Sequence, residues 1–450
     1  MNYFNAFSGG VPISGAHYLI ELEGKRIAID CGAVQKGGKV LPPPIAQGRV
    51  DALFLTHGHL DHVGMLPLFV KEHPDTPVYG TKVTWRFTRM LLWDSYWVTL
   101  KKLERGEKVE TYFSATDIER ALNLKRFNLV REPEWFSPWP GWKIRFWPAG
   151  HINGAASIHI VSPKGFRIVH SGDISFHDQP TIRGAEVVND IFSPEVLITE
   201  GTYGDRNLPN RFEEEWRFVN RVIGIIKGGG KVLVPSFSIT GPNIGIILAN
   251  GLAKARVDIP VHLDGMVRTA AGIISGSSEW SSNDNGLIFP KNLVAVPEKD
   301  PDDPEKAYNY RRKILDGGPA VVVSSHGMLE GGLAMFYLQH LITDYKSVVL
   351  LPGYQAEGTG GRRLLELERG HYFQINRKQF PIYCGVERFQ LSSHASGNEL
   401  AGWISEIQPW HVIITHAPYS AAEGLERKIK ERHPAIRVSG GFNGVDVPLD

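Results

Sequence analysis

The chain has 450 residues, more than one ordinary hydrophobic core holds, which favours two domains or one domain with a large insertion. Its 49 lysines and arginines nearly balance 48 aspartates and glutamates, so a net charge of +1 excludes a global field that attracts nucleic acid or an anionic membrane. Two cysteines, Cys31 and Cys384, exclude a disulfide framework and a cysteine-rich zinc site. The longest charge-free run, residues 232–253, is interrupted by proline and serine, so we expect a soluble, cytoplasmic protein without a membrane span.

The first two hundred residues are expected to form mainly strands. Alternating apolar residues over 17–23 and 26–30 predict a hairpin that ends at Asp30. A short buried strand over 51–56 leads into His57-Gly-His-Leu-Asp-His62, after which the apolar spacing predicts a helix. Further strands are predicted over 143–147, 157–161, 166–170 and 195–199.

From about residue 205 the pattern changes to alternating strands and helices, which is typical of an α/β fold with a parallel sheet. Helices are predicted over 211–227 and 242–255, and strands over 231–235, 260–264, 319–323 and 346–351. The polar, proline-rich stretch 275–306 predicts a surface excursion. After about residue 386 the segments shorten again, with a helix over 397–407, a strand over 411–415 and a helix over 420–433.

The segment after the strand at 51–56 carries four ligand-type side chains within six residues, His57, His59, Asp61 and His62. Two imidazoles at a spacing of two leave an extended strand end on the same side. Imidazole nitrogens and a carboxylate gathered at one strand end indicate a metal site. A helix-capping aspartate among solvated histidines would explain one or two of these residues, but not all four.

Three more ligand-type residues follow other predicted strands: His151, Asp173 and His416. The ends of strands are where sites gather in α/β proteins. Taken singly, either histidine would more often be a surface residue or a satisfied core residue. Taken together, the seven residues supply the nitrogen and oxygen ligands that a two-zinc site needs, with a carboxylate to bridge the ions.

Three later segments complete a recognisable order of motifs. They are Ile-Thr-Glu-Gly-Thr-Tyr-Gly-Asp-Arg over 198–206, Leu-Ser-Ser-His-Ala-Ser-Gly over 391–397 and Ile-Thr-His-Ala-Pro over 414–418. With the histidine-rich segment and Asp30 upstream, this order resembles the metallo-β-lactamase fold. Over nearly the whole chain it resembles the β-CASP group of nucleases, including RNA nucleases of the cleavage and polyadenylation specificity factor type. The resemblance implies an αββα sandwich over 1–205 and 386–450, with an α/β β-CASP domain inserted over 206–385.

The resemblance also implies roles for the site residues. One zinc ion would be held by His57, His59 and His151. The second would be held by Asp61, His62 and His416, with Asp173 bridging. The implied catalytic set is His394 as general acid, Glu200 orienting it, Asp61, and Asp30 orienting a ligand histidine.

The inserted segment departs from the family pattern at two places. The arginine that relatives carry near residues 241–243 is missing, and His326 stands in a motif that usually reads Ser-Pro-Gly-Met. His326, Arg362 and Arg363 are candidate phosphate contacts, although a solvated loop or helix face explains such residues equally well. Seven of the eleven tryptophans lie between residues 85 and 147; they could stack on unpaired bases, but packing in the core is the favoured interpretation.

Family likeness implies a two-zinc ribonuclease that cuts single-stranded RNA and leaves a 5′-phosphate and a 3′-hydroxyl, by endonucleolytic or 5′-exonucleolytic attack. RNA is favoured over DNA because RNA-cutting members carry histidine at the position of His416. The alternatives are a DNA nuclease, a hydrolase of small esters or thioesters, and a catalytically dead scaffold subunit. The inserted domain disfavours the small-molecule hydrolase, and the complete ligand set disfavours the scaffold. Target selection would fall to the inserted domain, to a homo-oligomer or to a partner protein.

Overall fold

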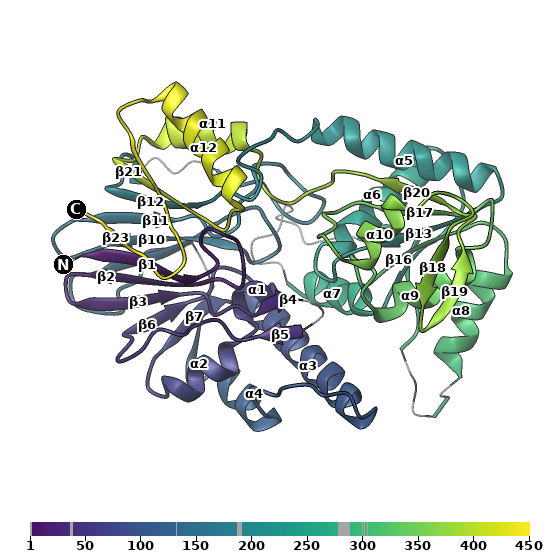
Figure 1. The fold of residues 1–450 in the computed structure, drawn as a ribbon, viewed down its shortest axis with the longest axis horizontal. Coiled ribbons are helices and arrows are strands. Elements are labelled where there is room, and N and C mark those ends of the chain that lie inside the picture. Colours follow the sequence, from purple (N-terminus) through teal and green to yellow (C-terminus); the bar gives the residue numbers. More distant parts are fainter. Residues whose placement is uncertain are drawn as a thin grey trace.

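The structure is a computed structural model that describes residues 2–36, 39–131, 133–186, 191–277, 289–298, 300, 302–303 and 305–450. Two bodies lie side by side in Figure 1. One body holds two stacked sheets and both ends of the chain, and the other holds a third sheet between helices. No helix in the described part of the chain is long and apolar enough to cross a membrane.

The first sheet has seven strands in the order β23-β1-β2-β3-β6-β7-β8. The predicted hairpin is confirmed as β2 and β3, which pair antiparallel around a turn where Gly24 has a φ of +78°. The strands are β1 (Tyr3–Ser8), β2 (His17–Leu22), β3 (Lys25–Ile29), β6 (Ala52–Phe54), β7 (Val78–Thr81), β8 (Phe127–Val130) and β23 (Asp446–Pro448).

The second sheet has six strands in the order β22-β21-β12-β11-β10-β9. It faces the first sheet across one apolar core in which alternate residues such as Ile20, Phe54, Ile158 and Ile198 are fully buried. The strands are β9 (Lys143–Pro148), β10 (Ala156–Val161), β11 (Arg167–His170), β12 (Val196–Glu200), β21 (His411–Thr415) and β22 (Arg437–Gly440).

Helices cover the outer faces of both sheets, which completes four αββα layers. On the first sheet, α1 (Leu60–Val63), α2 (Leu66–Glu72) and α4 (Ala115–Ala121) bury apolar residues against the strands, and α3 (Lys82–Glu104) packs beside them. On the second sheet, α11 (Gly397–Ile407) and α12 (Tyr419–Arg432) pack against each other and against the strands.

The third sheet is parallel throughout, with six strands in the order β15-β14-β16-β13-β17-β20. Its central strands are uninterrupted apolar runs because helices cover both faces. The strands are β13 (Lys231–Pro235), β14 (Val261–Asp264), β15 (Leu293–Ala295), β16 (Ala320–Ser324), β17 (Val348–Leu351) and β20 (Gly385–Arg388). The helices are α5 (Arg211–Lys227), α6 (Gly241–Lys254) and α7 (Met266–Ser275) on one face, and α8 (Lys306–Asp316), α9 (Gly332–Leu341) and α10 (Gly360–Glu366) on the other.

The predicted fold class, an αββα sandwich with an inserted α/β domain, is confirmed. We propose 1–205 with 386–450 as the sandwich domain and 206–385 as the inserted domain. Part of the polar excursion expected over 275–306 lies outside the described residues, and its described part includes β15. Two further pairs of strands are antiparallel, β4 (Val34–Lys36) with β5 (Lys39–Leu41) and β18 (Tyr372–Ile375) with β19 (Lys378–Pro381).

The tryptophan-rich segment serves mainly in packing. Trp85 and Trp93 pack beside a small cluster between α3 and α4, and the Trp85 indole donates to the Leu122 carbonyl at 3.0 Å. Trp142 is buried in the core between the sheets. Trp97 is the exception, because about half of its surface is exposed on α3.

Candidate metal centre

The seven predicted ligands come together at one edge of the sandwich because they follow strands that end side by side. Strands β11, β12 and β21 run parallel, so Asp173, Glu200 and His416 emerge at the same edge. Strands β3 and β6 are also parallel, which places Asp30 beside the segment that begins at His57.

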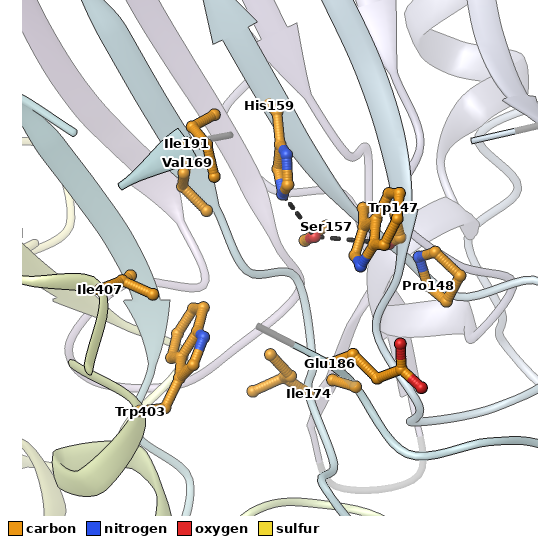
Figure 2. Close-up of a pocket in the computed structure, with 11 residues that line it drawn as sticks. Trp147, Pro148, Ser157, His159, Val169, Ile174, Glu186, Ile191, Trp403 and Ile407 are labelled. Atoms are coloured by element: carbon orange, nitrogen blue, oxygen red, sulfur yellow. Dashed lines mark hydrogen bonds between the residues drawn. The ribbon is translucent and has the colours of Figure 1, made fainter. Parts of the chain in front are cut away.

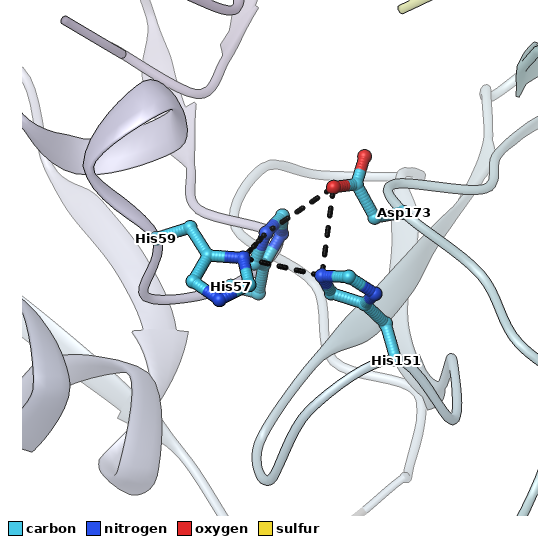
Figure 3. Close-up of side chains that lie close together, drawn as sticks. All are labelled: His57, His59, His151 and Asp173. Carbon is cyan, nitrogen blue, oxygen red and sulfur yellow. Dashed lines mark hydrogen bonds and ion pairs between the residues drawn. The ribbon is translucent and has the colours of Figure 1, made fainter. Parts of the chain in front are cut away.

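The first cluster consists of His57, His59, His151 and Asp173 (Figure 3). The Nδ1 atom of His59 lies 3.1 Å from the Nε2 atoms of both His57 and His151. The Oδ2 atom of Asp173 lies 3.5 Å from Nε2 of His57 and 3.6 Å from Nε2 of His151. Three imidazole nitrogens and one carboxylate oxygen therefore lie close together, and this donor set could hold a metal ion.

The second cluster consists of Asp61, His62 and His416 and faces the same Asp173. Nε2 of His62 lies 3.4 Å from Oδ2 of Asp173, and Nε2 of His416 lies 3.7 Å from Oδ2 of Asp61. Three buried atoms, Nε2 of His62, Nε2 of His416 and Oδ1 of Asp173, have no hydrogen-bond partner among the described residues. Buried polar atoms without partners are costly, so this donor set fits a bound cation.

Asp30 and Thr56 orient two of the ligand histidines. Fully buried Asp30 accepts hydrogen bonds from the Thr56 amide at 2.8 Å and hydroxyl at 2.7 Å, and its Oδ2 atom lies 2.8 Å from Nδ1 of His62. The Thr56 hydroxyl proton is thus committed to Asp30, which leaves the oxygen to accept from Nδ1 of His57 at 3.0 Å. Both histidines therefore carry a proton on Nδ1 and turn Nε2 toward the cluster. Sequence reasoning missed Thr56, although its position next to His57 was a usable signal.

Burial keeps the three histidines of the first cluster ready to bind a metal. It holds the pKa of the His57 and His151 imidazoles well below the usual value and lowers the pKa of His59 to about 4. Burial opposes charge on His62 as well, but Asp173 and Asp30 on either side raise its pKa. Burial alone would raise the pKa of Asp61, yet His416 and His62 bring it well below its ordinary value. His57, His59 and His151 are therefore neutral and Asp61 is ionised, as metal binding requires, whereas His62 must release a proton when a metal ion binds.

His394 lies beside the clusters but is engaged by Glu200. Nδ1 of His394 is 2.9 Å from both carboxylate oxygens of buried Glu200, which also accepts the Ile174 amide and the Thr202 hydroxyl. The His394 ring centre is 4.5 Å from that of His151. Burial lowers the pKa of His394, but the Glu200 carboxylate outweighs it and raises the value to about 9. A protonated imidazole held at the edge of a metal cluster can donate a proton to a leaving group.

The candidate phosphate contacts belong to neither ligand cluster and follow β16 or lie on α10 in the inserted segment. His326 follows β16 and is partly buried, and its Nδ1 atom accepts from the Met328 amide at 3.3 Å. Arg362 and Arg363 are exposed on α10, where they pair with Glu366 and Glu330. Their contact with phosphate stays a prediction.

A cavity on the outer face of the second sheet is too small to be a substrate site (Figure 2). Its accessible volume is about 20 Å³, which holds roughly one water molecule and no nucleotide. Trp147, Ile174, Trp403 and Ile407 make its lining largely apolar, and the histidine in it, His159, is engaged by the Ser157 hydroxyl at 3.1 Å.

Gly32 is a point at which the site tolerates no side chain. A Cβ atom there would lie 1.7 Å from the carbonyl oxygen of Asp61. We expect Gly32→Ala to destabilise the fold by about 3 kcal/mol and to displace Asp61, because main chain must move. Denaturant unfolding and zinc retention measure both effects. Gly224→Ala in α5, where a Cβ would meet no atom within 4 Å, is the matched control. Unchanged stability and zinc retention in Gly32→Ala would contradict this expectation.

Comparisons with known proteins agree with the geometry. Three family descriptions match successive parts of the chain: "Metallo-beta-lactamase superfamily" over 11–197, "Beta-Casp domain" over 244–364 and "Zn-dependent metallo-hydrolase RNA specificity domain" over 379–439.

Two relatives match along most of their length. "RNase aCSPSF2" from Saccharolobus solfataricus is 30% identical over 467 residues, covering 100% of this chain and 86% of the relative. "Probable RNase MJ4" from Methanocaldococcus jannaschii is 28% identical over 400 residues, covering 88% of this chain and 89% of the relative. A crystal structure of a protein of unknown function from Enterococcus faecalis V583 superposes with a TM-score of 0.57 at 13% identity, covering 99% of this chain and 100% of that one, which supports the fold alone. The chain belongs to the β-CASP family of metallo-β-lactamase-fold nucleases.

Proposed function

We propose that this chain is a ribonuclease that uses two zinc ions to hydrolyse phosphodiester bonds in single-stranded RNA, leaving a 5′-phosphate and a 3′-hydroxyl. The observation that carries the proposal is the pair of ligand clusters that share Asp173, with a separate His394–Glu200 pair beside them. The names of the two relatives, both RNases, support RNA as the substrate.

Seven residues of the chain would bind the two zinc ions. His57, His59 and His151 would hold one zinc ion, Asp61, His62 and His416 the other, and Asp173 both. A zinc pair bound there would supply an activated water and would neutralise charge on the phosphate. Asp30 and Thr56 keep the rings of His62 and His57 aimed inward, so the ligand atoms are in place before any ion arrives.

His394 is suited to the departing oxygen of the RNA chain. Its Nδ1–H is held by Glu200, which leaves the proton on Nε2 free to be given away. When the bond between phosphorus and the 3′ oxygen breaks, that oxygen needs a proton to leave as a hydroxyl. Glu200 stabilises the protonated ring beforehand and prevents it from turning toward the metal ligands.

The test is cleavage of matched, end-labelled substrates by purified, metal-quantified protein at one fixed salt concentration. We expect single-stranded RNA to be cut faster than single-stranded DNA and faster than duplex RNA. Fixed salt is needed because phosphate contacts, for which Arg362, Arg363 and His326 are the proposed residues, weaken as salt rises. A ladder of products or a mononucleotide also separates endonucleolytic from exonucleolytic attack.

Two outcomes would move the function elsewhere. Equal or faster cleavage of DNA would make the protein a DNA nuclease of the same family. Failure to cut any polymer, together with hydrolysis of a small ester or thioester, would overturn the nuclease proposal itself.

A further inference from the structure

A buried and uncharged hydrogen-bond network joins the inserted domain to the metal ligand His151. Its centre is Gln179, which is 5% exposed and lies in the loop after β11. The side-chain Nε2 of Gln179 donates to the carbonyls of Gly150 at 2.9 Å and His151 at 3.0 Å. Its Oε1 accepts from the Ser393 hydroxyl at 3.2 Å and from Nδ2 of Asn243 at 3.4 Å. Two donors and two lone pairs are thus all in use, which is the full capacity of an amide.

Gln179 acts on His151 from two directions. It holds the His151 main chain through the two carbonyls just described. It also holds the Ser393 side chain, and the carbonyl of Ser393 accepts Nδ1–H of His151 at 2.7 Å. That second bond sets the ring rotation and the tautomer that presents Nε2 to the cluster. Because Ser393 precedes His394, the same amide also anchors the segment that carries the proposed general acid.

The inserted domain enters the network through Asn243, in the first turn of α6 and 2% exposed. Its Oδ1 accepts from the amide of Thr181 at 3.1 Å and lies 2.8 Å from the Thr181 hydroxyl. The Thr181 carbonyl accepts Nδ2 of Asn153 at 3.1 Å, two residues beyond His151. The Asn243 side chain therefore contacts one stretch of the sandwich domain, residues 179–181, and that stretch in turn bonds to the segments around His151 and Ser393.

We propose that Gln179 and Asn243 are positioning residues through which the placement of the inserted domain sets the orientation of His151. The inference rests on the proposed role of His151 as a zinc ligand. A buried polar network specifies one arrangement because every unmade bond would leave a buried group without a partner. Loss of Asn243 removes the acceptor of the Thr181 amide and one of the two donors to Oε1 of Gln179, so the loop around His151 loses part of its outer support.

The test measures zinc retention against a competing chelator, without RNA, in Asn243→Ala and Gln179→Met. We expect the affinity for one of the two zinc ions to fall about 10–100-fold, the range found when partners behind metal ligands are removed, while the other ion is held as in the unchanged protein. Asn292→Ala is the matched control, because Asn292 also lies in the inserted domain and donates to a main-chain carbonyl, that of Ala249 at 2.9 Å. It should lower the melting temperature without changing zinc affinity.

Thr181→Val keeps the side-chain shape and removes only the hydroxyl link, so it provides a folded variant if Asn243→Ala fails to fold. It should lower the affinity for the same zinc ion, but to a smaller degree. Variants that melt earlier, as the control does, but hold both ions with unchanged affinity would overturn the inference. A protein that holds two zinc ions and cuts no RNA would instead contradict the proposed function and leave this inference standing.

Discussion

Replacing His394 by alanine is expected to lower RNA turnover by about 10²–10⁴-fold while both zinc ions stay bound. The imidazole is held by Glu200 at 2.9 Å and, although it also lies near the shared Asp173, it belongs to neither ligand cluster, so we expect its loss to remove a proton donor without opening a metal site. Single-turnover cleavage rates and elemental analysis of the same preparation measure the two properties. Glu200→Gln should also lower RNA turnover, but less than His394→Ala does. The His394 ring remains in this variant, but the carboxylate charge that keeps it protonated is gone.

His416→Ala is the contrasting variant. Nδ1 of His416 is 3.5 Å from Oδ1 of Asp173 and its Nε2 faces Asp61, so this histidine belongs to the second ligand cluster. We expect the variant to lose one of the two zinc ions. If His394→Ala lost zinc and His416→Ala retained both ions, the two assignments would be reversed.

The clustering of the seven predicted ligands could be anticipated because they follow predicted strands, although their division between two ions came from the family resemblance. His57, His59, Asp61 and His62 stand together at a strand end, and His151 follows a strand whose alternating pattern is clear from sequence. Parallel strands bring such ends to one edge of a sheet, so convergence followed from topology. The inserted domain was predictable for a similar reason, because its uninterrupted apolar strands alternate with amphipathic helices.

The groups behind the ligands could not be predicted in the same way. Gln179 and Asn243 are 64 residues apart in the chain, and nothing near either residue distinguishes it from a loop amide or a helix cap. Their roles exist only once the inserted domain is seated on the sandwich. Helix α3 escaped prediction for a different reason: its first half buries Val83, Phe87 and Leu91, but its second half exposes Trp97, so the apolar periodicity fades along the helix.

Replacing Asp173 by asparagine is expected to reduce zinc content from about two ions per chain and to bring RNA cleavage to background. One carboxylate serves both clusters, since its Oδ2 atom lies within 3.4–3.6 Å of three histidine Nε2 atoms and its Oδ1 atom faces His416. An amide of the same shape offers only one lone-pair oxygen and carries no charge. The loss in zinc affinity should therefore exceed the 10–100-fold cost of removing a partner behind a ligand.

Asp178→Asn is a matched control, because Asp178 lies on the same loop but is exposed and accepts only the Gly184 amide, at 2.9 Å, among the bonds that the described residues show. It should keep both zinc ions and full activity. Asp173 also balances positive charge on His62 when no ion is bound, so its replacement could unfold the protein as well as release metal. Near-ultraviolet circular dichroism distinguishes these two effects, because it reports whether the tertiary structure is intact. A folded Asp173→Asn protein that still binds two zinc ions per chain would show that the carboxylate does not bridge them. In that case the two clusters would be independent sites, and Asp173 would not couple them.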